Sequence, residues 1–142
     1  TNFIYEEKNI DISHTSYSII NEMNKKISIR KARNLTFKDL VKSCDVGLST
    51  VVLKKEILKE DHFANLKTKE DYVLWLKLSK KGYTFYALRE NLASWRQTSR
   101  SLSSSTFQKL IDGYRVYRIY LKNSYLVSFM KLILLSFNYL KK

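Results

Sequence analysis

Apolar and polar positions alternate in the first half of the chain, and this period of two predicts strands there. Over positions 10–20, Ile10 and Ile12 and then Tyr17 and Ile19 stand two apart. The turn-like positions 21–24 follow, and the basic stretch after them is expected to form an exposed hairpin or loop. Other segments are short, apolar and β-branched or aromatic, which is typical of strands. The predicted strands lie at 10–20, 47–53 (a buried one), 83–88 and 92–96.

Apolar spacings of three and four predict helices between and after these strands. The clearest helix has Thr68 as its predicted N-cap and Gly82 as its stop signal, with Leu74, Trp75 and Leu78 on one stripe. Strands and helices therefore mix, and we expect an α/β fold: a partial mixed sheet with flanking helices, followed by C-terminal helices. The other predicted helical segments are 1–9, 37–43 (starting at Thr36), 106–121 and 124–140.

Length and charge narrow the class of protein. The 142 residues suit one domain, and 26 Lys and Arg against 13 Asp and Glu give a net charge of +13, which favours an anionic partner. No helix-turn-helix, zinc-finger or Gly-aromatic RNA-binding motif is present, so no nucleic acid partner is expected. The single cysteine, Cys44, excludes an internal disulfide framework and fits the cytoplasm.

The C-terminal segment predicts a helix that lies on a membrane without crossing it. No run of about 20 apolar residues exists, and after Asp112 the chain carries cations but no acidic residue. We expect this helix to rest on the anionic inner face of the plasma membrane; the alternative is docking on the domain's own core. The expected water-facing stripe is Ser124, Ser128, Lys131 and Asn138, and the expected lipid-facing residues are Phe129, Leu132, Ile133 and Phe137.

A pair of carboxylates, Glu70 and Asp71, begins the helix predicted after Thr68. One interpretation is structural, because acidic residues complement a helix N-terminus and Thr68 with Asp71 resembles a capping box. The other interpretation is chemical. A helix N-terminus favours the ionised carboxylate, so Asp71 would be a ready proton acceptor.

Four segments stand in a consistent order along the chain: Ser13-His-Thr-Ser-Tyr-Ser, Gly47-Leu-Ser-Thr-Val-Val-Leu, Lys69-Glu-Asp-Tyr-Val-Leu-Trp, and Ser94-Trp-Arg followed by Ser101-Leu-Ser. Together they resemble the C-terminal half of bacterial family 2 glycosyltransferases with a GT-A fold. The resemblance covers residues 1–105, which we expect to be the acceptor-side half of such a domain, with 106–142 as a separate helical region. These enzymes transfer a sugar from a nucleotide donor to an acceptor hydroxyl, usually with inversion.

The resemblance implies roles for particular residues. Asp71 would be the catalytic base, and Glu70 would orient the acceptor or the start of the helix. Arg96 would neutralise donor phosphate, and Thr50 would lie near the acceptor, where a core role is the alternative. Trp75 is expected in the core, and the loop with Ser101 and Ser103 is either a linker or a segment that closes over the donor.

The family's Asp-X-Asp motif, which holds Mg²⁺ or Mn²⁺ against the donor diphosphate, is absent from this sequence. We therefore expect the metal ligands to lie outside this chain and the chain alone to be inactive, either as a piece of a longer protein or as a degenerate relative. The partners implied are a nucleotide-sugar donor and a saccharide or lipid-linked acceptor. The competing hypothesis is a non-catalytic basic module that binds nucleic acid or an anionic membrane.

Overall fold

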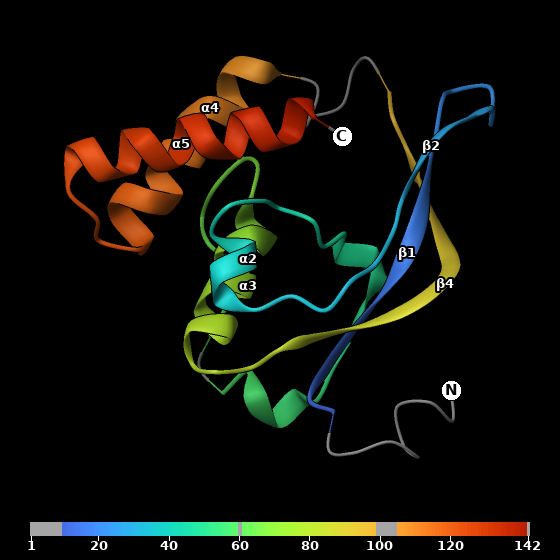
Figure 1. Ribbon diagram of the computed structural model, residues 1–142, viewed down its shortest axis with the longest axis horizontal. Helices are drawn as coiled ribbons and strands as arrows, with labels where there is room; N and C mark the ends of the chain where they lie inside the picture. The colour runs from blue at the N-terminus through green and yellow to red at the C-terminus, as the bar shows by residue number, and fades with distance from the viewer. Residues whose placement is uncertain (1–9, 60, 99–104, 142) are drawn as a thin grey trace.

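A mixed sheet is built around one long central strand, β1 (Ile12–Ile20). The computed structural model describes residues 10–59, 61–98 and 105–141 (Figure 1). Strand β4 (Phe85–Arg96) runs parallel to β1 along its whole length. Strands β2 (Lys26–Arg30) and β3 (Val51–Leu53) pair antiparallel with opposite ends of β1. Because a strand has two edges, β2 and β3 share the edge that β4 leaves free.

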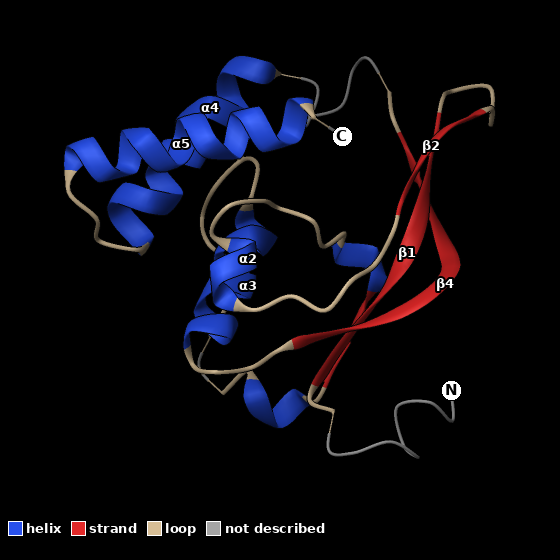
Figure 2. Cartoon of the chain, viewed as in Figure 1, coloured by secondary structure: helices blue, strands red, loops and turns tan. Residues whose placement is uncertain are grey.

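The helices cover one side of this sheet, so the predicted α/β class is confirmed (Figure 2). Helix α2 (Phe37–Leu40) begins after Thr36 as predicted, because the Thr36 backbone N–H and Oγ1 both donate to Asp39 Oδ2, at 2.9 and 2.6 Å. It is shorter than the predicted 37–43 segment. Helix α3 (Glu70–Lys80) lies at the centre of the core, and Gly82, at φ +100°, follows its end as predicted.

Two strand predictions need correction. The segment 47–53 is not one buried strand but a 3₁₀ turn, η1 (Leu48–Thr50), followed by the short strand β3, where Val52 is 58% exposed. The turn closes because the Thr50 N–H and Oγ1 both donate to the Gly47 carbonyl, at 2.9 and 2.7 Å. The predicted strands 83–88 and 92–96 are one irregular strand, β4, whose pairing register shifts opposite Ser16. A second 3₁₀ turn, η2 (Lys55–Ile57), was not predicted.

The predicted N-cap of α3 is also wrong. Lys69, in the left-handed conformation at φ 64° and ψ 18°, precedes the helix and makes no side-chain cap. The backbone N–H and Oγ1 of Thr68 instead donate to Asp112 Oδ2, both at 2.9 Å. A buried carboxylate far along the sequence therefore takes the bonds that local capping would have used.

The C-terminal helices pack onto the same core. Helix α4 (Thr106–Arg115) continues as one π-helical turn, η4 (Val116–Tyr120), and α5 (Tyr125–Leu140) follows with Ser124 as its N-cap. Tyr117 of η4 donates to the Val41 carbonyl at 2.9 Å, and Tyr72 of α3 donates to the Leu40 carbonyl at 2.6 Å. Burial raises the pKa of both tyrosines, that of Tyr117 to about 12, so both hydroxyls keep their protons as donors.

The predicted helix at 1–9 and the loop with Ser101 and Ser103 lie outside the described residues.

Candidate active site

Glu70 and Asp71 form the first turn of α3, where the sequence placed them. The backbone N–H of Tyr72 donates to Asp71 Oδ1 at 2.7 Å, which fixes one oxygen of this half-buried carboxylate. The capping box expected between Thr68 and Asp71 is absent, because Thr68 is bonded to Asp112. Asp71 therefore does not form a capping box with Thr68.

Burial raises the pKa of Asp71 above the ordinary value for an aspartate. The hydrogen bond from Tyr72 lowers this pKa, the Glu70 charge raises it and the Lys69 charge lowers it, but burial is the largest cause. The helix start was expected to favour the ionised form and so to lower the pKa of Asp71. This pKa is raised instead, because the effect of desolvation exceeds that of the local hydrogen bond. A carboxylate with a raised pKa is a stronger base than a free aspartate.

Tyr17 lies against the turn that contains Thr50, and the charge of Asp71 affects its pKa. A Cβ added at Gly47 would lie 3.2 Å from Tyr17 Cε1, so the turn and the ring approach closely. Burial raises the pKa of Tyr17, and the charges of Cys44, Asp71 and Tyr139 raise it further, while Arg30 lowers it. Sequence reasoning did not single out Tyr17, although it belongs to the segment starting at Ser13 that carried the family resemblance.

Arg96 lies apart from this cluster. It pairs with Ile20 at the end of β1, three residues beyond Tyr17, which places it about 10 Å further along the sheet. Its side chain is exposed and donates from Nη1 to the Glu22 carbonyl at 3.2 Å. The structure therefore places Tyr17 against the turn that contains Thr50 and within electrostatic range of Asp71, and it leaves Arg96 at the neighbouring end of the sheet.

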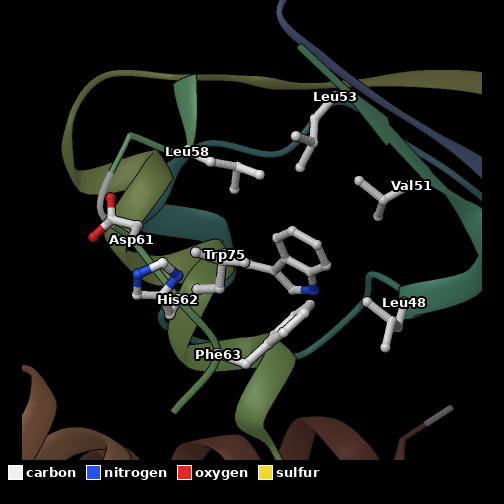
Figure 3. Close-up of a pocket in the computed structure, with 9 residues that line it drawn as sticks. Leu48, Val51, Leu53, Leu58, Asp61, His62, Phe63 and Trp75 are labelled. Atoms are coloured by element: carbon white, nitrogen blue, oxygen red, sulfur yellow. The ribbon is translucent and has the colours of Figure 1, made fainter. Parts of the chain in front are cut away.

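A pocket of about 360 Å³ opens between α3, β3, Leu58 and residues 61–63 (Figure 3). Trp75 lies in the pocket wall, is 2% exposed and packs edge-on against Phe85 with ring centroids 5.5 Å apart, so the predicted core position is confirmed. Its indole Nε1 is buried without a hydrogen-bond partner in the described part of the chain. At the polar end of the pocket, Asp61 pairs with Lys81 and Lys77.

The described residues do not fit a divalent metal. Among them, no three His, Cys, Asp or Glu side chains lie close enough together to share an ion. We therefore derive no step through a metal from this chain. In the same residues, every helix is too short or too polar to cross a bilayer.

These features define an α/β domain with a half-buried acidic pair at the start of a helix. The chain is similar in sequence to bacterial glycosyltransferases. TuaG of Bacillus subtilis, named as a teichuronic acid biosynthesis glycosyltransferase, is 31% identical over 114 residues, which cover 79% of this chain and 45% of TuaG. WfgD of Escherichia coli, a UDP-Glc:alpha-D-GlcNAc-diphosphoundecaprenol beta-1,3-glucosyltransferase, is 30% identical over 106 residues, covering 73% and 41%.

An uncharacterised glycosyltransferase of Rickettsia felis is 32% identical over 80 residues, which cover 54% of this chain and 13% of that protein. No family model matches the chain. The predicted resemblance to bacterial glycosyltransferases is confirmed, and the chain spans less than half the length of these relatives.

Proposed function

We propose that this chain is the acceptor-side half of an inverting, family 2-like glycosyltransferase with a GT-A fold, and that Asp71 is its catalytic base. The observation that carries the proposal is the half-buried Asp71 carboxylate at the start of α3, with a raised pKa and one oxygen held by Tyr72. The names of the similar proteins support glycosyl transfer in general.

In the proposed reaction, Asp71 removes the proton from an acceptor hydroxyl as its oxygen attacks the anomeric carbon of the donor sugar. A new carbon–oxygen bond forms on one face of the sugar, and the bond to the nucleoside diphosphate breaks on the other face. The proton ends on Asp71, and the nucleoside diphosphate leaves. Because the Tyr72 N–H holds Oδ1, Oδ2 is the atom assigned to take the proton.

The neighbouring residues have proposed roles in binding. Glu70, half-exposed beside Asp71, orients the acceptor. Thr50 is 4% exposed and donates its hydroxyl proton to the Gly47 carbonyl, which supports the alternative core role and not contact with the acceptor. Arg96, exposed at the end of β4, is assigned to the donor diphosphate, whose geometry suits a planar guanidinium.

The donor requires more than these residues supply. The family resemblance implies Mg²⁺ or Mn²⁺ at the diphosphate, and this chain offers no cluster for it among the described residues. We therefore expect transfer only from a full-length protein that includes a donor-binding half, and no turnover from this chain alone.

The acceptor is proposed to be a saccharide or a lipid-linked glycan at the cytoplasmic face of the plasma membrane. WfgD is named for an acceptor sugar linked to diphosphoundecaprenol. The competing basic-module hypothesis has the net charge of +13 in its favour. It predicts a gel-mobility shift with nucleic acid, and we expect none beyond that of any protein of equal charge.

The test is product analysis with the full-length protein, nucleotide sugars and a lipid-linked saccharide acceptor. We expect acceptor-dependent release of nucleoside diphosphate and a product whose anomeric configuration is inverted relative to the donor. A product with retained configuration would contradict the inverting mechanism. Failure to consume any nucleotide sugar in the presence of metal and acceptor would contradict the proposed function itself.

A further inference from the structure

Helix α5 turns its polar stripe toward the domain, which reverses the expected orientation. Ser128 is fully buried and donates to the Ser124 carbonyl at 2.8 Å. Asn138 donates to the Lys42 carbonyl at 2.9 Å, and half-buried Lys131 donates to Asn123 Oδ1 at 3.4 Å. These three side chains are buried or half-buried and have partners in the protein, so the prediction that they face water is wrong; Ser124, at the start of the stripe, is exposed as predicted.

The opposite side of α5 is apolar and exposed. At 100° per residue, the exposed apolar residues of α5 fall on one side of the helix. Apolar side chains of α4 and η4 are exposed as well. Soluble proteins rarely expose contiguous apolar surface of this kind without using it to bind a partner. We call the exposed side of α5 the apolar face; it consists of Tyr125, Leu126, Phe129, Met130, Ile133, Leu134, Phe137 and Leu140.

Cations border the apolar face. The Arg118 guanidinium lies over the Tyr125 ring at 4.2 Å, and the Lys141 ammonium lies over the Phe137 ring at 4.3 Å. From residue 106 onward the only acidic residue is Asp112, which is fully buried and bonded to Thr68. An apolar surface with a rim of cations and aromatics is complementary to the acyl boundary and the anionic headgroups of a lipid bilayer.

We propose that the apolar face inserts into the acyl boundary of an anionic bilayer, with α5 parallel to the membrane plane and the bordering cations on lipid phosphates. A second copy of the chain is a poorer occupant, because two surfaces with the same cationic rim repel each other. The role assigned to this membrane contact rests on the proposed function, because the proposed lipid-linked acceptor lies in the plane of the bilayer.

The C-terminal end of α5 is tied to the segment that follows α2, because Asn138 donates to the Lys42 carbonyl. The charge of the neighbouring Tyr139 also helps to raise the pKa of Tyr17, as the charge of Asp71 does. A bilayer on the apolar face therefore brings acceptor saccharides at headgroup level close to the proposed base.

The test uses the 142-residue chain and a matched pair of variants in vesicle co-sedimentation. Ile133→Glu places a carboxylate on the apolar face, at a position that is 54% exposed. Ile27→Glu makes the same chemical change at a 56% exposed position of β2, across the molecule from α5 (Figure 1). The vesicles are phosphatidylcholine alone or phosphatidylcholine with phosphatidylglycerol, and circular dichroism checks that each variant is folded.

We expect the wild type to bind phosphatidylglycerol vesicles, with binding that falls as salt rises. Ile133→Glu should reduce the affinity about tenfold or more, and Ile27→Glu should leave it within about twofold. Equal binding by wild type and Ile133→Glu overturns the proposal, as does an equal loss in both variants. A soluble dimer that Ile133→Glu converts to a monomer, without wild-type vesicle binding, assigns the face to a second copy and also overturns it.

The Asp71→Asn variant separates this inference from the proposed function. It should bind vesicles as the wild type does, whatever its activity. If vesicle binding fails while the full-length protein still transfers sugar to a soluble acceptor, the membrane inference falls and the function stands.

Discussion

Asp71 is the residue whose environment departs most usefully from the one that its local sequence suggests. A carboxylate at a helix start is ordinarily a cap with a lowered pKa. Here Thr68 is bonded elsewhere, and burial raises the pKa of Asp71 despite its hydrogen bond from Tyr72. The buried charge therefore opposes folding at neutral pH, which is typical of a functional carboxylate and not of a stabilising cap.

Asp71→Asn should be at least as stable as the wild type at pH 7. Because the pKa of Asp71 is raised in the folded state, the unfolded state ionises first as pH rises above about 3.9. The wild type therefore loses stability with rising pH until the pH has passed the folded-state pKa. The amide carries no charge and its oxygen still accepts from the Tyr72 N–H. Thermal unfolding of the chain at pH 7 and near pH 3 measures the difference, which should shrink at the lower pH. A clear destabilisation at pH 7 would identify Asp71 as a stabilising cap.

Arg96→Ala should weaken donor binding in the full-length protein more than it weakens acceptor binding. The exposed guanidinium at the end of β4 is proposed to contact the diphosphate, where a charge-assisted hydrogen bond contributes about 1.5–3 kcal/mol. Calorimetric titration with nucleotide sugar should therefore show an affinity reduced by about tenfold or more. Arg89→Ala, at another exposed position of the same strand, is the control. An unchanged donor affinity would leave Arg96 with only its bond to Glu22.

At the scale of elements, Asp112 holds α4 to the start of α3. It accepts from the Thr68 N–H, from Thr68 Oγ1 and from Gln108 Nε2, and Arg115 lies 3.7 Å away. Burial acts to raise the pKa of Asp112, but these hydrogen bonds and the Arg115 charge outweigh it, so its pKa lies below the ordinary value. Its contribution to stability is present above the unfolded pKa and is lost as pH falls through the folded pKa.

Asp112→Ala should lower the free energy of unfolding by about 1–3 kcal/mol at pH 7, because it leaves the buried Thr68 N–H without a partner. Thr68→Val removes one hydroxyl and keeps the backbone bond, so it should cost about 1 kcal/mol. Urea unfolding measures both changes. An equal cost for the two variants would mean that the hydroxyl alone carries this contact.

The elements that sequence reasoning predicted well are those whose evidence is local. The alternation in β1, the stripe and glycine stop of α3 and the apolar spacing of α5 lie within the segments themselves. The errors depend on distant partners: Thr68 binds Asp112 across 44 positions, and Asn138 binds Lys42 across 96. Sequence reasoning placed Glu70 and Asp71 correctly at the start of α3. It did not single out Tyr17, because Tyr17 meets the distant Gly47 only in the folded chain.

At the scale of the whole molecule, three features are gathered around one region of the sheet. They are the acidic pair, Tyr17 with the turn that contains Thr50, and the end of α5. The apolar face and its cations extend from that region along α5. The chain spans 45% and 41% of TuaG and WfgD, and we propose that this arrangement supplies the acceptor side of a longer glycosyltransferase. The central claim is that Asp71 performs the proton transfer at the centre of this arrangement.

Sugar transfer by the full-length protein, compared between Asp71→Asn and Glu70→Gln, tests that claim most directly. The two variants make the same acid-to-amide change at adjacent positions of the first turn of α3. We predict that Asp71→Asn lowers kcat by about 10²–10⁴-fold with unchanged donor affinity, while Glu70→Gln mainly raises the KM for the acceptor. Near-normal kcat in Asp71→Asn, or an equal loss of kcat in both variants, would contradict the account.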